Sequence, residues 1–169
     1  LLLPIVFVHY TIIIGTGLYY HELWGDELQS WNLVKGSSSI FNLFSTIKYE
    51  GHPPVWHILL WILSKFAHTP EYMKVLHFII ALLLGGVILF LSPFPPMFRV
   101  TMVMGYYFVF EYAVISRNYG IGALFAFLTV WVMTKEFRHK NIVYYLLLFL
   151  TANVHLLSCL LAISIHAGY

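Results

Sequence analysis

Cysteine is nearly absent from this 169-residue chain, in which Cys159 is the single thiol. One cysteine cannot form an internal disulfide or supply a zinc site built from paired cysteines. Charge is also scarce, at 9% of residues, and the few Lys and Arg side chains form no dense basic patch. The sequence therefore predicts no nucleic-acid partner. It indicates no cofactor and no metal ligands, although a divalent metal is compatible with the composition.

The sequence also gives no indication of a targeting segment. The chain begins at Leu1 without an initiator Met or a basic stretch, and it ends at Tyr169 inside or just after an apolar run. This pattern indicates no signal peptide. We interpret both ends as cuts through a longer protein, and we expect residues 1–169 to be the N-terminal part of one transmembrane domain.

Apolar residues dominate what is present. They make up 60% of the chain, against about 45–50% in soluble globular domains. Long apolar runs occupy residues 1–20, 75–92, 100–116, 118–134 and 142–165, and a membrane helix needs roughly 17–25 residues. Tyr and Trp flank many of these runs, as expected for side chains at headgroup level. The sequence predicts an all-α, polytopic transmembrane helix bundle with about five spans.

A sixth apolar stretch, residues 54–66, decides the topology. As a helix it would reach only about 20 Å, against a hydrocarbon core of about 30 Å. If it crossed the membrane, the basic cluster at 135–140 would lie outside, against the positive-inside tendency. If it lies in the interface, that cluster falls in the cytoplasm together with Arg99. We prefer the second interpretation, which makes residues 21–73 one exterior loop.

The predicted helices follow from this choice. Two short juxtamembrane helices, at 25–34 and 54–66, lie in the exterior loop and are separated by turn-prone Gly, Ser and Pro residues. The remaining membrane helices are expected at 72–92, 98–115, 118–134 and 141–165, after a first helix that ends near Tyr20.

Adjacent carboxylates, Asp26 and Glu27, follow the first apolar run. On a helix their side chains diverge by about 100°, so they cannot both address one atom. One can act as a general base for an acceptor hydroxyl while the other orients it or binds the acceptor. The alternative is a solvated helix start, with Gly25 and Asp26 forming an N-terminal cap. Local sequence slightly favours this alternative.

Three basic side chains are candidates for binding a phosphate. His52 precedes Pro53 and Pro54 at the expected start of the interfacial helix, where free amide groups can face an anion. Arg117 interrupts a nearly continuous apolar stretch, and a charge at membrane depth usually faces a cavity or a partner. Lys74 begins the second membrane helix. The alternatives are a structural histidine and two side chains that extend to the membrane surface.

These motifs occur in a familiar order. Asp26-Glu27, then His52-Pro53-Pro54 with its short apolar helix, then Ser116-Arg117-Asn118-Tyr119 resemble the N-terminal part of type C superfamily membrane glycosyltransferases. The nearest members are the protein O-mannosyltransferases and the bacterial lipid A aminoarabinose transferases. The resemblance covers nearly all of the chain.

The resemblance implies an exterior active site that transfers a sugar, with inversion, from a polyprenyl-phosphate donor to an acceptor of unknown identity. Lys74 stands where the family usually has Arg, and Lys lacks the bidentate fork of a guanidinium. Glu111 is the only candidate for an acid that the family often has near the end of the third membrane helix. The expected site comprises Asp26 and Glu27 as catalytic residues, His52, Lys74 and Arg117 at the donor phosphate, and Gln29 and Tyr119 lining the substrate.

We therefore expect a multi-pass integral membrane enzyme, in the plasma membrane of a prokaryote, whose partners are the lipid donor, the acceptor and the bilayer. A transporter or flippase-like protein, with a polar path lined by the same charges, is the alternative. No inverted repeat supports this alternative. A non-catalytic membrane scaffold is the third interpretation.

Overall fold

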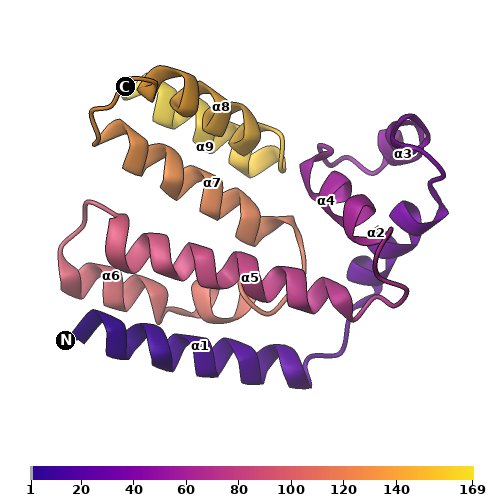
Figure 1. The fold of residues 1–169 in the computed structure, drawn as a ribbon, viewed down its shortest axis with the longest axis horizontal. Coiled ribbons are helices and arrows are strands. Elements are labelled where there is room, and N and C mark those ends of the chain that lie inside the picture. The colour runs from indigo at the N-terminus through magenta and orange to yellow at the C-terminus, as the bar shows by residue number, and fades with distance from the viewer. Residues whose placement is uncertain (1) are drawn as a thin grey trace.

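The computed structural model describes residues 2–169, and these residues form helices with no strand among them (Figure 1). The predicted all-α class is confirmed. The helices are α1 (Leu2–Tyr20), α2 (Gly25–Gly36), α3 (Ile40–Thr46), the 3₁₀ helix η1 (Ile47–Tyr49), α4 (Val55–Leu63), α5 (Tyr72–Gly86), the π-helix η2 (Val87–Leu91), α6 (Pro96–Val103), the π-helix η3 (Tyr107–Glu111), α7 (Asn118–Met133), α8 (Lys140–Ala152) and α9 (Leu156–Ala167).

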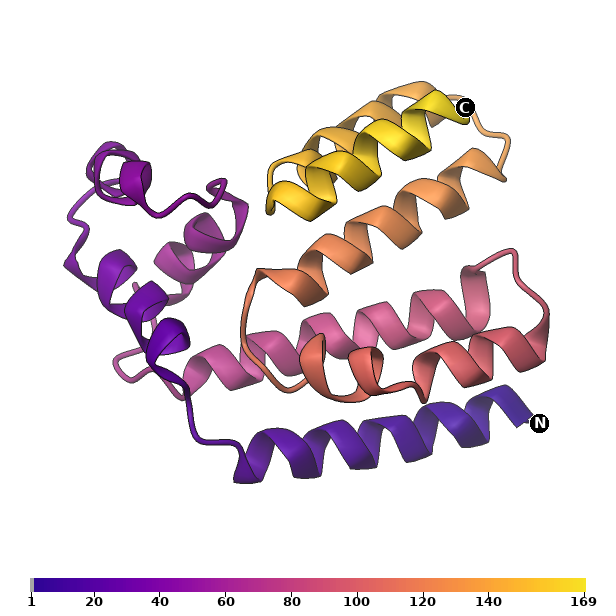
Figure 2. The same ribbon diagram turned by 180° about the vertical axis from the view of Figure 1, so that it is seen from behind.

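The long helices lie side by side in a bundle, while α2, α3 and α4 gather beyond one end of it (Figure 1). Helix α5 contacts both α1 and α7 and so occupies the middle of the bundle. From behind, α6 and η3 are seen to lie against α1 and α5 (Figure 2). Helix α4 lies at the end of the bundle and not alongside it (Figure 1), while its placement in a membrane interface stays a prediction.

Two helices are long and apolar enough to cross a membrane, namely α1 with 19 residues and the continuous α5–η2 segment, Tyr72–Leu91, with 20. Three further apolar helices, α7, α8 and α9, are shorter, at 16, 13 and 12 residues. At about 1.5 Å per residue they reach about 18–24 Å, which is less than the hydrocarbon thickness of about 30 Å. By length, two of the five predicted spans are present.

Several predicted boundaries are confirmed. Helix α1 ends at Tyr20, α2 occupies 25–36 where 25–34 was predicted, and α7 occupies 118–133 where 118–134 was predicted. Helix α3 was not predicted, although Ser39 caps it by accepting a hydrogen bond from the Asn42 N–H at 3.1 Å. Serine at this position is a common helix start signal.

The single helix predicted at 98–115 is wrong. Helix α6 ends at Val103, a turn follows at Met104 and Gly105, and the π-helix η3 leads into an irregular segment that ends at Arg117. Glycine disfavours a helix interior by about 1 kcal/mol relative to alanine. The aromatic residues after Gly105 are also weaker helix formers than Ala or Leu. The segment therefore has a high hydropathy but a low helix propensity, and the prediction relied on the hydropathy.

The single helix predicted at 141–165 is also wrong. The chain reverses at residues 153–155, so α8 and α9 form an antiparallel hairpin (Figure 1). The Tyr144 hydroxyl, at the start of α8, lies 3.2 Å from His166 Nδ1 at the end of α9. The Tyr144 ring also stacks on Tyr169, with the ring centroids 4.3 Å apart.

Polar side chains in the turn explain this reversal. Asn153 donates from Nδ2 to the Phe149 carbonyl at 2.8 Å. His155 caps α9 by accepting from the Ser158 N–H at 3.3 Å. Side-chain hydrogen bonds of this kind offer the backbone an alternative to continuing the helix. The two polar residues were outweighed in the prediction by the apolar residues around them.

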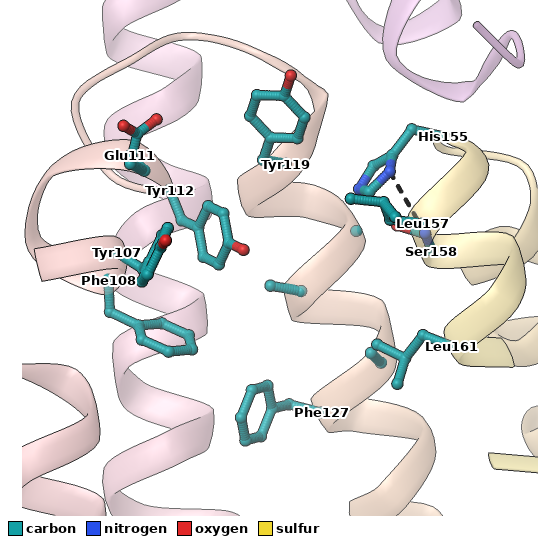
Figure 3. Close-up of a pocket in the computed structure, with 13 residues that line it drawn as sticks. Tyr107, Phe108, Glu111, Tyr112, Tyr119, Phe127, His155, Leu157, Ser158 and Leu161 are labelled. Carbon is teal, nitrogen blue, oxygen red and sulfur yellow. Dashed lines mark hydrogen bonds between the residues drawn. The ribbon is translucent and has the colours of Figure 1, made fainter. Parts of the chain in front are cut away.

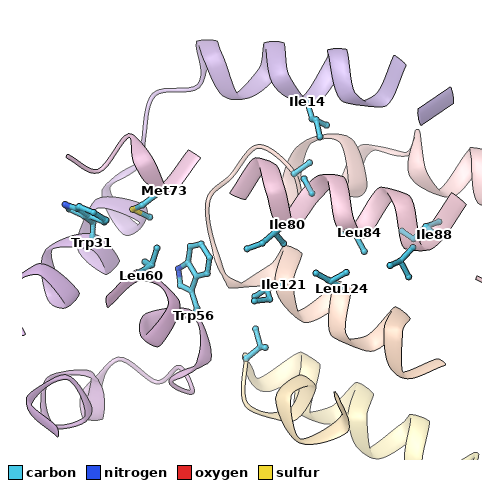
Figure 4. Close-up of a cluster of buried hydrophobic side chains, with 14 of the residues drawn as sticks. Ile14, Trp31, Trp56, Leu60, Met73, Ile80, Leu84, Ile88, Ile121 and Leu124 are labelled. Carbon is cyan, nitrogen blue, oxygen red and sulfur yellow. The ribbon is translucent and has the colours of Figure 1, made fainter. Parts of the chain in front are cut away.

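The apolar core runs from the end group of helices into the bundle (Figure 4). It joins Trp31 of α2 and Trp56 of α4 to residues of α5 and α7. Tyr10 of α1 is fully buried, and its hydroxyl donates to the carbonyls of Ala81 at 3.2 Å and Phe108 at 3.1 Å. The core therefore ties α1, α5 and η3 together beneath the end group.

Two neighbouring glycines of α5 provide a test of this packing. A Cβ atom at Gly85 would lie 2.5 Å from Tyr10 Cε1, whereas at Gly86 the nearest atom would be Phe7 Cε2 at 3.9 Å. We expect Gly85→Ala to destabilise the protein by about 1–3 kcal/mol through overpacking. Gly86→Ala should be neutral or stabilising, because alanine is the better helix former. Thermal unfolding of both variants in one detergent measures the difference, and equal midpoints would contradict this packing.

Candidate active site

Glu27 lies at the start of α2 and is fully buried, with 0% of its side chain exposed. Its Oε2 atom accepts from the Trp24 N–H at 2.8 Å and lies 2.8 Å from His21 Nε2. Its Oε1 atom accepts from the Ser116 N–H at 2.6 Å. Both carboxylate oxygens are therefore used within the protein, one at the cap of α2 and one at the loop before α7.

Asp26 is the accessible member of the acid pair. Its side chain is 38% exposed, and its Oδ2 atom lies 2.5 Å from Arg117 Nη1. Its Oδ1 atom accepts from the Glu27 N–H at 2.9 Å. The Arg117 guanidinium lies 5.1 Å from the centroid of the Tyr119 ring, in cation–π contact. The structure thus brings together Asp26, Arg117 and Tyr119, which the sequence assigned to three parts of one site.

Tyr119 lines a groove of about 490 Å³ between η3, α7 and α9 (Figure 3). At one end of this groove lie Glu111, Tyr119 and His155, and toward the other end lie Phe127 and Leu161 (Figure 3). The groove therefore has a polar end, next to Arg117, and an apolar end deeper in the bundle. Its remaining lining residues include Tyr107, Phe108, Tyr112, Gly122, Ala123, Ala126, Leu157 and Ser158.

His52 lies near the polar end of this groove and outside the Asp26–Arg117 pair. Burial lowers the pKa of His155, and the nearby His52 ring lowers it further. Burial and His52 have the same two effects, in that order, on the pKa of His57 in α4. The start of α4 is also tied to the α8–α9 turn, because the Val55 N–H donates to the Asn153 carbonyl at 3.4 Å. The start of α4 therefore lies close to the turn that carries His155, and the role of His52 at the donor phosphate stays a prediction.

Lys74 takes a different position from the one predicted. Its Nζ atom donates to the His21 carbonyl. The side chain lines a second groove, of about 380 Å³ between α1 and α5, with Tyr19 and Phe78, and no residue is shared with the Tyr119 groove. Lys74 is therefore linked to Glu27 through His21, and its assignment to the donor phosphate gains no geometric support.

Gln29 is also separated from the Tyr119 groove. Its Nε2 atom donates to Glu50 Oε2 at 2.9 Å. It lines a surface groove of about 600 Å³ between α2 and α3, whose wall includes Gly25 and Thr46. The residues expected to line one substrate site, Gln29 and Tyr119, thus lie in two different grooves.

Sequence reasoning missed two contributors and left a third open. His21 was not included in the site, although its ring and its carbonyl bind Glu27 and Lys74. His155 was not among the predicted site residues, and the signal that could have identified it is a helix-capping position before Ser158. Glu111 pairs with the Tyr106 hydroxyl, which donates to its Oε1 atom at 2.9 Å, while Arg117 pairs with Asp26.

Comparisons with protein-family models, with curated proteins and with solved structures find no match to this chain.

Proposed function

We propose that these residues belong to an inverting membrane glycosyltransferase, which moves a sugar from a polyprenyl-phosphate donor to an acceptor at the exterior membrane face. One observation carries the proposal. A partly exposed carboxylate, Asp26, is paired with a cation, Arg117, which stacks on Tyr119 at the polar end of an amphipathic groove. A base, a phosphate-binding cation and a lipid-sized apolar channel are the three parts that this reaction needs.

The groove suits an amphipathic donor. Its apolar end, at Phe127 and Leu161, can hold the isoprenoid chain, and its polar end can hold the phosphate near Arg117. A guanidinium pairs with phosphate through two parallel hydrogen bonds. As the sugar leaves, negative charge grows on the phosphate oxygen, and a cation already positioned there stabilises the transition state.

Asp26 acts on the acceptor. Its carboxylate takes the proton of the acceptor hydroxyl, and the oxygen attacks the anomeric carbon from the face opposite the phosphate. The new carbon–oxygen bond forms while the bond to the phosphate oxygen breaks, and polyprenyl phosphate leaves with the electron pair. Attack from the opposite face inverts the anomeric configuration, as with the base carboxylate of inverting glycosidases.

The ion pair between Asp26 and Arg117 supports an order of events. Without a donor, the guanidinium neutralises the carboxylate that must act as the base. A donor phosphate competes for the same guanidinium and leaves Asp26 with a weaker partner. The base becomes available when the donor is in place, so the donor binds before the acceptor reacts.

Sidedness follows from the two ends of the bundle. The acid pair lies in the α2–α4 end group, and the basic loop between α7 and α8 lies at the opposite end (Figure 1). The positive-inside tendency assigns that loop to the cytoplasm and the acid pair to the exterior. We therefore propose a multi-pass protein of a prokaryotic plasma membrane with its active site outside.

A transporter or flippase-like protein is the second candidate, and one observation favours it. His77 is fully buried in α5, and neither of its ring nitrogens has a hydrogen-bond partner among the described residues. Ionisable groups buried in membrane helices often mark polar paths. A proteoliposome assay separates the two candidates, because transfer releases polyprenyl phosphate whereas transport moves a solute without breaking a covalent bond.

The donor groove gives the proposal a direct test. Ala123 of α7 lines the groove, so Ala123→Leu in the intact protein should obstruct the isoprenoid chain. We expect the KM for a long-chain polyprenyl-phosphate sugar to rise about tenfold, since overpacking costs about 1–3 kcal/mol. A short-chain analogue should be affected less, and Ala167→Leu, at the exposed end of α9, should change neither.

Two results would count against the proposal. Absence of transfer from every polyprenyl-phosphate sugar tested, by a folded wild-type protein, would reject the glycosyltransferase. Equal effects of Ala123→Leu on long-chain and short-chain donors would place the lipid chain in another part of the molecule.

A further inference from the structure

We infer that Glu27 is a positioning residue, which fixes the backbone at Ser116 and thereby holds Arg117 against Asp26. The part of this inference that concerns the donor phosphate rests on the proposed function. The part that concerns the position of Arg117 does not.

Each acid of the pair Asp26-Glu27 in α2 contacts one residue of the dipeptide Ser116-Arg117 before α7. The Glu27 carboxylate accepts from the Ser116 backbone, and the Asp26 carboxylate pairs with the Arg117 side chain. Side chains of adjacent helical residues diverge by about 100°. This divergence lets Glu27 point into the protein and Asp26 toward the accessible face. The adjacency that prevents the two acids from sharing one reacting atom allows them to hold one dipeptide at two points.

The segment that Glu27 holds lies outside the helices, and its own backbone hydrogen bonds are local, from residues 113–115 to the Phe110 carbonyl and from Arg117 to the Ile115 carbonyl. Between η3 and α7 the backbone forms turns, and Arg117 is extended, with φ −123° and ψ −179°. Ser116 is fully buried, so its N–H would lose its acceptor if the Glu27 carboxylate were removed. A buried donor without a partner costs about 1–3 kcal/mol. The segment is expected to move in order to recover that hydrogen bond, and Arg117 would move with it.

Burial separates the roles of the two acids. Glu27 is fully buried and its two oxygens are engaged by His21, Trp24 and Ser116, so an acceptor hydroxyl cannot reach it without breaking those contacts. Asp26 is 38% exposed. The carboxylate predicted as a catalytic companion therefore acts through another residue and not on the reacting atoms.

The buried Glu27 carboxylate, with its contacts to His21 and Ser116, also links three parts of the chain. His21, in the linker after α1, contacts Glu27 through its ring and accepts from Lys74 of α5 through its carbonyl. The Lys74 ammonium is thus connected to Glu27 through a single residue, His21. This gives Lys74 a place in the site that does not require contact with the donor.

Chemical labelling of Arg117 tests the inference without relying on sugar transfer. Phenylglyoxal modification of the intact protein, followed by mass spectrometry, reports each of its arginines separately. Glutamine offers one neutral acceptor oxygen where Glu27 uses two ionised ones, at Ser116 and at Trp24, so it cannot satisfy both N–H groups and binds either one more weakly. We therefore expect Glu27→Gln to increase the rate at Arg117 about five- to thirtyfold, as loss of one or two kcal/mol of restraint implies. Arg99, which donates to the carbonyls of Phe94 and Leu89 at the α5–α6 turn, should keep its rate.

Glu22→Gln is the matched control, because it removes the same charge from an exposed residue in the linker between α1 and α2. It should leave the labelling of Arg117 unchanged. Glu27→Ala tests the same contact more severely, and Glu27→Gln keeps the inference testable if the alanine variant does not fold. An unchanged Arg117 rate in a folded Glu27→Gln protein would overturn the inference.

Kinetics give a second, independent measurement. Glu27→Gln should raise the donor KM more than it lowers kcat, and the acidic limb of the pH–rate profile should remain because the base, Asp26, is intact. Loss of that limb in Glu27→Gln would mean that Glu27 is itself the base. If the protein transfers no sugar at all, the proposed function fails, while the labelling result still decides whether Glu27 anchors Arg117.

Discussion

Replacing Asp26 with asparagine is expected to lower the kcat for the proposed sugar transfer by roughly 10²–10⁴-fold, the range that a general base contributes. Asparagine has nearly the shape of aspartate, and its one amide oxygen can accept a hydrogen bond from Arg117 or from the Glu27 N–H, which bind different oxygens of Asp26. It cannot take a proton from the acceptor hydroxyl. The loss should therefore fall on kcat, with the fold and the donor site preserved.

The donor KM should rise little in this variant and can even fall. In the wild-type protein Asp26 competes with the donor phosphate for the Arg117 guanidinium. A neutral amide competes less well, because it lacks the negative charge that attracts the guanidinium and has one acceptor oxygen in place of the two of a bidentate carboxylate. Initial rates against donor concentration, with liberated polyprenyl phosphate as the product measured, give both parameters.

Glu22→Gln serves as the control here too, since Glu22 is exposed and forms no hydrogen bond or ion pair among the described residues. A folded Asp26→Asn protein that transfers sugar at the wild-type rate would reject Asp26 as the base. If that variant instead altered a solute flux and the protein transferred no sugar, the result would favour the transporter.

Arg117→Ala should lower kcat/KM for the donor by about 10²–10³-fold, as expected when one preorganised donor to a developing negative charge is lost. The leaving phosphate would gain its charge without a fixed cation beside it. The same change leaves Asp26 without its ion-pair partner. The loss should therefore appear in kcat and in the donor KM together.

Arg117→Lys should recover only part of this loss. Lysine keeps the charge but lacks the planar fork for bidentate phosphate binding and the stacking of Arg117 on Tyr119. Arg138→Lys, on the exposed loop before α8, is the control and should keep wild-type kinetics. An Arg117→Ala protein with normal donor kinetics would remove the cation from the mechanism proposed above.

The sequence predicted the helices that end at strong signals and missed the breaks that depend on weak ones. Helices α1, α2 and α7 lie where apolar runs or cap residues placed them. The breaks at Gly105 and at residues 153–155 lie within apolar runs, where a window of hydropathy averages over one or two polar or flexible residues. Local hydrogen bonds determine such breaks, and a hydropathy average does not describe them.

The sequence predicted some of the residues that belong to the site, but not the contacts between them. Placing Asp26 and Arg117 on one membrane face followed from topology, and the structure pairs them directly. The hydrogen bond from Ser116 to Glu27 joins residues 89 positions apart, and no spacing rule for one chain reports such a contact. For the same reason Lys74 and Gln29 were assigned to a groove that neither of them lines.

The hairpin of α8 and α9 changes the number of times that the chain would cross a membrane. A single helix over 141–165 would carry the backbone from one face of the bilayer to the other, whereas two helices that double back produce no net crossing. Tyr169 accordingly returns to the beginning of α8, where its hydroxyl lies 3.5 Å from Asn141 Oδ1. The two marked chain ends lie at the same end of the bundle (Figure 1). Residues 156–169 therefore run back along α8 and end at the face of the bundle where α8 begins.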